Sequence, residues 1–245
     1  MRCPIFDITA FRWLIRIGIT AIGIILLSAV INVEGGCAKE KTLDTQHIDL
    51  PDPTPNSGTT LEKALNGRRS VRDFSDKPLA LENIAQLLWA AQGITHSRGF
   101  RTAPSAGALY PLEIYAVIGD GAKTDAGIYH YRPKTHQIKP VAEGDQRKAL
   151  CRAGLNQSAI CNAPLSIVMT GVFERTTGKY GKRGMQYVFM EAGHAAQNVL
   201  LQAESIGLGA VPIGAFDNKA VSRVLHLSES ETPLYILCIG HSTTD

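Results

Sequence analysis

The 245-residue sequence has few charged residues and little imbalance between their signs. Charged residues make up 19% of the chain, and 25 Lys and Arg against 22 Asp and Glu give a formal net charge of +3. This balance excludes a strongly basic nucleic-acid-binding protein and an acidic disordered tail. The mean hydropathy is −0.01 and only one long apolar run is present, which excludes a membrane protein with several spans.

Several catalytic and metal-binding motifs are also absent. The sequence lacks a P-loop, a nucleophile elbow, an HExxH motif and a CxxC pair. Its five cysteines show no zinc-site spacing, and their odd number argues against a disulfide-based scaffold. Cys151 and Cys161 could pair in an exported domain, but we expect both to be packed thiols. We predict no metal site.

The long apolar run lies near the N-terminus. Arginines precede an uncharged stretch over residues 17–33, and two glycines lead to Cys37. This arrangement is typical of an export signal or a single membrane anchor, with the rest of the chain outside the cytoplasm. We therefore predict a signal peptide or anchor over residues 1–37. Lipid attachment at Cys37 is an alternative, and a wrongly assigned start site would leave the protein cytoplasmic.

Residues 38–59 are polar and rich in proline, which predicts an extended linker, and a folded domain then covers residues 60–245. Apolar spacing predicts a long helix over residues 185–206 and a buried strand over residues 165–172. The mixture of elements favours an α+β fold, with a mostly antiparallel central sheet flanked by helices. The other predicted elements are helices over 61–66, 81–92, 146–153 and 218–225, and strands over 113–118, 127–132, 137–141, 210–213 and 234–239.

Small residues form one face of the long predicted helix. They are Ala192, Gly193, Ala195, Ala196 and Ala203. Small side chains let another helix approach closely, which suits either a subunit interface or the core of a single subunit. Glu191 and His194 lie three residues apart on the same helix. We expect a core histidine with a carboxylate partner here rather than a metal ligand.

A basic loop follows the first predicted helix and contains Arg68, Arg69, Ser70 and Arg72. Guanidinium groups bind phosphate through two parallel hydrogen bonds and keep their charge at all relevant pH values. In an extended loop, Arg68, Ser70 and Arg72 would point to one side and Arg69 to the other. The loop is therefore either an anion site for a phosphorylated ligand or a solvated basic segment.

Three further segments could contribute to a ligand site. Small residues over 104–107 allow a flat ligand to approach closely, and the glycine-rich segment 207–214 can direct backbone N–H groups into a cleft. Lys179 and Tyr180 can each move a proton, and the nearby glycines indicate a mobile loop. Their spacing alone favours a solvated charged loop.

These segments, in this order, resemble the nitroreductase-like flavoprotein family, and most closely its thiazoline/oxazoline (SagB-type) dehydrogenase branch. The matching segments are RRSVRDF (68–74), PSAGALYPLEIY (104–115), GIYHYRPKTHQI (127–138), KYGKRG (179–184), EAGHAAQN (191–198), GLGAVPIGAF (207–216) and LYILCIGH (234–241). The resemblance implies the nitroreductase-like fold and a homodimer, with FMN at the interface and the long helix between the subunits.

The resemblance also implies roles for individual residues. Arg68 and Ser70 would bind the FMN phosphate, and Arg72 would lie near the pyrimidine edge of the flavin ring. The remaining residues implied to contact FMN are Arg69, then Pro104, Ser105 and Ala106 from the partner subunit, and Pro212, Ile213 and Gly214 in a turn whose backbone N–H faces flavin N5. Lys179 and Tyr180 match a pair that removes a proton from the substrate.

The function implied by this resemblance is an FMN-dependent oxidoreductase that transfers a hydride through flavin N5. The substrate would be a nitro compound or quinone with NAD(P)H as donor, or an azoline or other peptide-derived compound. The alternative is a non-catalytic, membrane-tethered flavin-binding partner protein. Many relatives bind the phosphate with a Lys or Arg after the last strand, whereas residues 241–245 contain neither. The phosphate would then depend on the basic loop, Arg101 or Arg183.

Overall fold

The computed structural model of the protein describes residues 47–56, 58–120 and 124–243. The predicted signal peptide or anchor over residues 1–37 lies outside these ranges. In the described part of the chain, no helix combines the length and the apolar character that crossing a bilayer requires.

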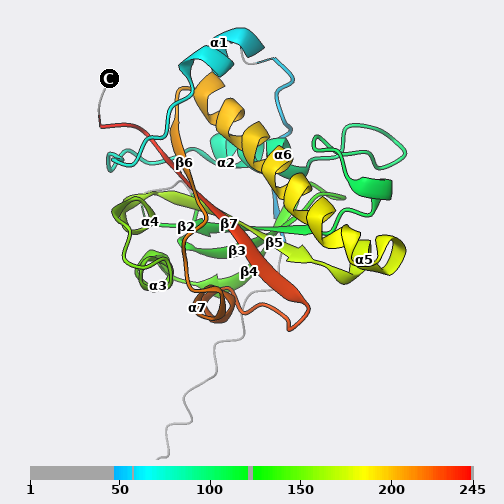
Figure 1. Ribbon diagram of the computed structural model, residues 1–245. Helices are drawn as coiled ribbons and strands as arrows, with labels where there is room; N and C mark the ends of the chain where they lie inside the picture. The colour runs from blue at the N-terminus through cyan, green and yellow to red at the C-terminus, as the bar shows by residue number, and fades with distance from the viewer. Residues whose placement is uncertain (1–46, 57, 121–123, 244–245) are drawn as a thin grey trace, which may run out of the picture. The chain divides into compact units, whose positions relative to one another are not determined.

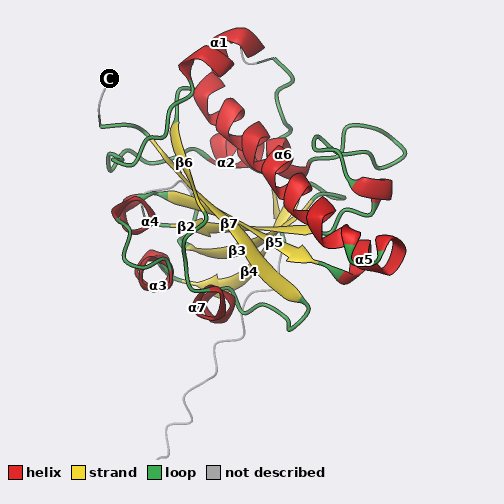
Figure 2. Cartoon of the chain, in the orientation of Figure 1, coloured by secondary structure: helices red, strands yellow, loops and turns green. Residues whose placement is uncertain are grey.

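Within the described residues, seven strands form one sheet in the order β1-β4-β3-β2-β5-β7-β6 (Figures 1 and 2). Every neighbouring pair in this order is antiparallel, which confirms the predicted sheet type. The strands are β1 (Ile48–Asp49), β2 (Leu112–Ile118), β3 (Gly127–Arg132), β4 (Gln137–Glu143), β5 (Leu165–Val172), β6 (Gly209–Ile213) and β7 (Glu231–Gly240).

Helices pack on both faces of the sheet, because the central strands are apolar on both faces. In β2, Ile114 and Ala116 belong to one apolar core, whereas Tyr115 and Val117 belong to another. The first core includes α2 (Leu81–Gln92) and α6 (Arg183–Ser205), and α1 (Leu61–Gly67) contacts α6. The second core includes α3 (Arg147–Ala153), α4 (Ser158–Asn162) and α7 (Asn218–Val224).

Four of the five small residues of α6 serve packing within the chain, whereas Gly193 is exposed. Ala192, Ala195, Ala196 and Ala203 are buried in the first core, and α2 is the helix that α6 contacts most. The large apolar residues that remain exposed on α6 are Met185, Phe189 and Met190, with exposed fractions of 48%, 54% and 51%. Any interface formed by α6 would therefore use this second face of the helix, not the alanine face.

The extended segment before Thr60 packs along the domain in its described part. Ile48 and Asp49 pair with β4 as an edge strand, and Leu50 is buried. The side-chain amide of Gln86 on α2 forms hydrogen bonds with both backbone groups of Thr54. Its Oε1 accepts from the Thr54 N–H at 2.8 Å, and its Nε2 donates to the Thr54 carbonyl at 3.0 Å. The proline-rich segment thus has no core of its own but adds to the core of the domain.

Cys151 and Cys161 form a disulfide, so the expectation of two packed thiols is wrong. The first cysteine lies in α3 and the second in α4, and their Cα atoms are 4.7 Å apart. The sequence shows that these cysteines are ten residues apart, but not that the two short helices lie side by side. Cys238 is a buried free thiol in β7.

Candidate functional site

The basic loop is fixed to the sheet by its backbone. Ser70 forms a parallel bridge with Ala210 of β6, and the Val71 N–H donates to the Ala210 carbonyl at 3.1 Å. The Val71 side chain lies directly over Gly209, where a Cβ would come within 2.7 Å of it. The loop therefore follows β6 and carries its arginines to the end of that strand.

The arginines of this loop have different environments. Arg69 donates to the carbonyls of Asn66 and Arg68, both at 2.9 Å, at the C-terminal end of α1, where a positive charge is favourable. Arg72 is exposed, and within the described residues its guanidinium makes only one long contact, 3.4 Å to the Ser70 carbonyl. The guanidinium of Arg72 thus keeps most of its hydrogen-bonding capacity for a ligand.

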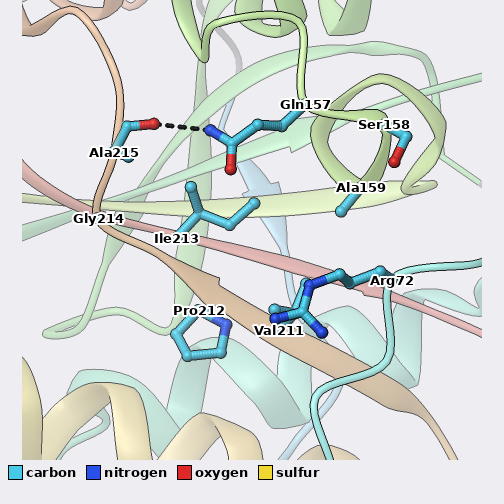
Figure 3. A pocket seen from close by; sticks show the side chains of 9 residues that line it. All are labelled: Arg72, Gln157, Ser158, Ala159, Val211, Pro212, Ile213, Gly214 and Ala215. Atoms are coloured by element: carbon cyan, nitrogen blue, oxygen red, sulfur yellow. Dashed lines mark hydrogen bonds between the residues drawn. The ribbon is translucent and has the colours of Figure 1, made fainter.

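A cavity of about 320 Å³ brings Arg72 together with the predicted turn at the end of β6 (Figure 3). The lining residues are Arg72, Gln157, Ser158, Ala159, Val211, Pro212, Ile213, Gly214 and Ala215. We call this group the cavity half-site. It joins predicted residues that are about 140 positions apart in the sequence. It also adds a wall at Gln157–Ala159, which the sequence analysis did not predict.

The turn in the cavity half-site offers unpaired backbone donors. Within the described residues, the N–H groups of Gly214 and Ala215 have no hydrogen-bond partner. Gly214 is exposed, and a Cβ built on it would meet only Tyr235, at 3.9 Å. Apolar walls, a cation and free backbone donors suit a flavin ring, which has apolar faces and a polar edge. The residues present therefore fit FMN.

A second group of predicted residues meets around Gly107. This glycine lies in the short 3₁₀ turn η1 (Ala106–Ala108) and has a φ of 63°. A Cβ on Gly107 would come within 2.8 Å of the Tyr180 hydroxyl and 3.1 Å of the Lys179 Nζ. Lys179 and Tyr180 thus contact the 104–108 loop, and we call residues 104–108 together with Lys179 and Tyr180 the loop half-site.

Lys179 and Tyr180 belong to a helix, so the prediction of a mobile loop is wrong. They form the last turn of α5 (Glu174–Tyr180), which ends at Gly181 with a φ of 55°. Gly178 lies inside this short helix and has a low helix propensity, so the residue pattern did not indicate a helix here. The pair is therefore held by regular backbone against η1.

A buried polar cluster contacts the loop half-site through Ser105. Glu191 on α6 is 2% exposed, and its carboxylate accepts hydrogen bonds from Ser105 and from Gln92 Nε2, the latter at 3.3 Å. Gln92 also accepts from Arg101 Nη1 at 2.8 Å, and the Arg101 guanidinium lies 4.3 Å from the Tyr110 ring centre. Burial raises the pKa of Glu191 to about 7, and the two hydrogen bonds limit the rise.

This cluster corrects one expectation from the sequence. Glu191 is buried but His194 is exposed, so they are not a buried pair. Their spacing places them near each other on the helix, but only Glu191 points toward α2. Arg101 is committed to Gln92 and Tyr110, and Arg183 lies over the Tyr187 ring at 5.7 Å. Neither arginine lines the cavity half-site.

In Figure 1, α1, which precedes the basic loop, lies at one end of α6, and α5, which ends with Lys179 and Tyr180, lies at the other. Gly67, just before the basic loop, lies against Glu204 in the last turn of α6, whereas Tyr180 precedes the first turn. A helix of 23 residues is about 34 Å long. The residues predicted to contact one flavin are therefore presented in two separate groups.

Comparison with known proteins agrees with this architecture. The profile of the nitroreductase family matches residues 65–241. The candidate nitroreductase MJ1384 of Methanocaldococcus jannaschii is 43% identical over 197 residues, which cover 80% of this chain and 97% of that protein. The microcin B17-processing protein McbC of Escherichia coli is 27% identical over 181 residues, which cover 71% of this chain and 66% of McbC.

A solved structure shows the same fold. The crystal structure of a candidate nitroreductase from Ralstonia eutropha JMP134 superposes with a TM-score of 0.71 and 29% sequence identity, and covers 81% of this chain and 90% of that one. The region matched by the family profile includes both half-sites and the whole of α6. The chain therefore belongs to the nitroreductase family of oxidoreductases.

Proposed function

We propose that the protein is an FMN-dependent oxidoreductase that works as a homodimer. The observation that carries this proposal is the cavity half-site, where an exposed guanidinium with one long hydrogen bond, two backbone N–H groups without a partner among the described residues, and an apolar wall meet. FMN, when bound there, would supply the hydride chemistry at its N5 atom. NAD(P)H is the proposed electron donor for reductive reactions.

The residues of the cavity half-site would hold and tune the ring. Arg72 would stabilise the negative charge that a reduced flavin carries at its pyrimidine edge, since a fixed cation near that edge lowers the energy of the reduced form. The turn at Ile213–Ala215 would direct its free N–H groups at the ring. Arg68 and Ser70, at the start of the same loop, would bind the phosphate.

A homodimer would complete the site. One chain presents its two half-sites at separate places, and a two-fold axis can bring the loop half-site of one copy over the cavity half-site of the other. The exposed apolar residues of α6 offer a surface that such a contact would bury. In this arrangement Pro104, Ser105 and Ala106 would reach the flavin of the partner subunit.

Lys179 and Tyr180 would act on the substrate. Their side-chain ends lie together on Gly107, where either could take a proton from a carbon or nitrogen next to the bond that is oxidised. The similarity to McbC, a protein named for processing microcin B17, supports a peptide-derived azoline as the substrate class. The reduction of nitro compounds or quinones is the other activity that membership of the family supports.

We also propose that the domain works outside the cytoplasm. The basic and apolar N-terminal sequence and the Cys151–Cys161 disulfide both support this location, because disulfides persist mainly in oxidising compartments. Fractionation of the source cells, combined with protease treatment of intact spheroplasts, tests it. Protection of the chain from added protease would contradict it.

The proposed function is tested on the full chain purified in mild detergent. We expect a yellow protein with the absorbance bands of oxidised flavin, a dimeric mass by light scattering, and bleaching of the bands by NADPH or by a thiazoline-containing peptide. A preparation that stays colourless after FMN is added would refute flavin binding. Flavin that binds but is reduced by none of these compounds would favour the non-catalytic, membrane-tethered alternative.

A further inference from the structure

The wall of the cavity half-site at Gln157–Ala159 belongs to a segment closed by the disulfide. Cys151 in α3 and Cys161 in α4 bracket this segment, and both are partly exposed. Between them the chain makes a tight turn, in which Leu155 and Asn156 have φ values of 61° and 56°. Such left-handed backbone is unfavourable for residues other than glycine and persists only where its surroundings hold it.

Gln157 connects this segment to the flavin-facing turn. Its Nε2 donates to the Ala215 carbonyl at 2.7 Å and to the Gly154 carbonyl at 2.8 Å (Figure 3 shows the first). A second tether runs from the Asp217 N–H to the Ala153 carbonyl, at 2.9 Å. The turn over residues 214–217 is thus held at two points by the end of α3 and the residues that follow it.

The disulfide is the covalent support of these contacts. The helix α4 has five residues, too few to be stable without help from its surroundings. The bond to Cys151 joins α4 to α3, and beside this bond the Gln157 amide reaches both carbonyls. Without this bond the segment would have more freedom, and the left-handed residues could relax.

We propose that Gln157 is a positioning residue for the Ile213–Ala215 turn, and that the Cys151–Cys161 disulfide holds Gln157 in place. Reduction of the disulfide would then loosen the turn and weaken flavin binding. A dithiol supplies the two electrons and two protons, leaves as its cyclic disulfide, and converts Cys151 and Cys161 to thiols. The link to flavin rests on the proposed function, whereas the link from Gln157 to the turn does not.

The first test replaces Gln157 with methionine, which is similar in size and lacks the donor. Gln146→Met is the matched control, because Gln146 Nε2 also donates to a carbonyl, that of Glu143 at 3.0 Å, but away from the cavity. In the flavin-free protein, we expect faster amide hydrogen exchange over residues 212–217 in Gln157→Met only. FMN should bind about fivefold more weakly, as expected for the loss of one such hydrogen bond, and the flavin midpoint potential should shift.

The second test changes the disulfide. We expect wild-type protein treated with dithiothreitol and then desalted to show the same faster exchange and weaker FMN binding. The double variant Cys151→Ser, Cys161→Ser should behave like the reduced protein, with no further response to dithiothreitol. This test also decides the matter if Gln157→Met does not fold.

The outcomes separate the two proposals. Unchanged exchange over residues 212–217 in both Gln157→Met and the reduced wild type would overturn the positioning role, whether or not FMN binds. Altered exchange in a wild type that never binds FMN would keep the positioning role and refute the proposed function. A potential that stays constant while affinity falls would limit Gln157 to packing and overturn the flavin-facing part of the proposal.

Discussion

The two half-sites are built from different kinds of group. The cavity half-site presents an exposed guanidinium and backbone N–H groups, all of which are hydrogen-bond donors. The loop half-site rests on Ser105 and a buried Glu191 whose pKa lies at about 7. The comparison indicates that one half offers hydrogen-bond donors to a cofactor, whereas the other contains a carboxylate that can gain or lose a proton near neutral pH.

The largest expected effect would place proton removal from the substrate in the loop half-site. In the double variant Lys179→Ala, Tyr180→Phe, we expect oxidation of a thiazoline-containing peptide to slow by about 100-fold, because general-base catalysis is lost. FMN affinity and reduction by NADPH should remain as in the wild type. Single-turnover kinetics followed by flavin absorbance measure both. Equal turnover of the thiazoline in variant and wild type would remove the pair from the mechanism.

The next effect tests the buried carboxylate. Since burial raises the pKa of Glu191 in the folded protein, the wild type should lose stability as pH rises from about 4.5 to about 7. Glu191→Gln cannot ionise and should escape this loss, so that at pH 8 it is more stable by ~3 kcal/mol, with no gain at pH 4. Denaturant unfolding at several pH values measures the difference.

A matched control for this measurement is Glu229→Gln, at an exposed position. Its unfolding free energy should follow that of the wild type across the pH range. If Glu191→Gln also follows the wild type, the carboxylate is not the proton-sensitive part of the loop half-site, and the contrast between the two halves disappears.

A smaller effect is expected from the cavity half-site. Arg72→Gln should raise the FMN dissociation constant about 30-fold, because a hydrogen bond to a charged group contributes roughly 2 kcal/mol. Lys63→Gln on the exposed face of α1 is the control and should bind FMN normally. Flavin fluorescence titration gives the constants, and an unaltered value for Arg72→Gln would contradict the assigned role.

The smallest effect isolates a steric contact. Gly107→Ala places a methyl group 2.8 Å from the Tyr180 hydroxyl at a φ of 63°, whereas Gly99→Ala has a φ of 81° and open space around it. Both should lose about 1 kcal/mol of stability from the left-handed backbone. Only Gly107→Ala should also slow thiazoline oxidation, since it displaces Tyr180. Similar kinetics in both variants would mean that the contact has no catalytic consequence.

Periodicity predicted the elements that build the core. The strand over 165–172 and the helix over 81–92 appear with the predicted bounds, because β5 is apolar on both faces and α2 has a full apolar stripe. The helix α5 was missed because it is short and contains Gly178. The edge strand β1 was missed because its two residues are too few to show the alternating pattern of a strand.

Residues of the site were predicted only where the residue type itself indicates a chemical role. Arg72 and the 212–214 turn could be paired through a family resemblance, although they are far apart in sequence. Gln157 could not, since its role depends on a side-chain amide that meets the Ala215 carbonyl after α3 and α4 have packed. Glu191 was noticed on the helix but assigned the wrong partner, because helical spacing does not reveal which face is buried.

Both edges of the described sheet are poor templates for further strands. At one edge, β1 has two residues and Pro51 follows directly after Leu50, so that the backbone offers few donors. At the other edge, β6 is partly covered by its bridge to Ser70. Such edges protect against intermolecular β-aggregation. The described sheet should therefore resist fibril growth that is seeded through its edges.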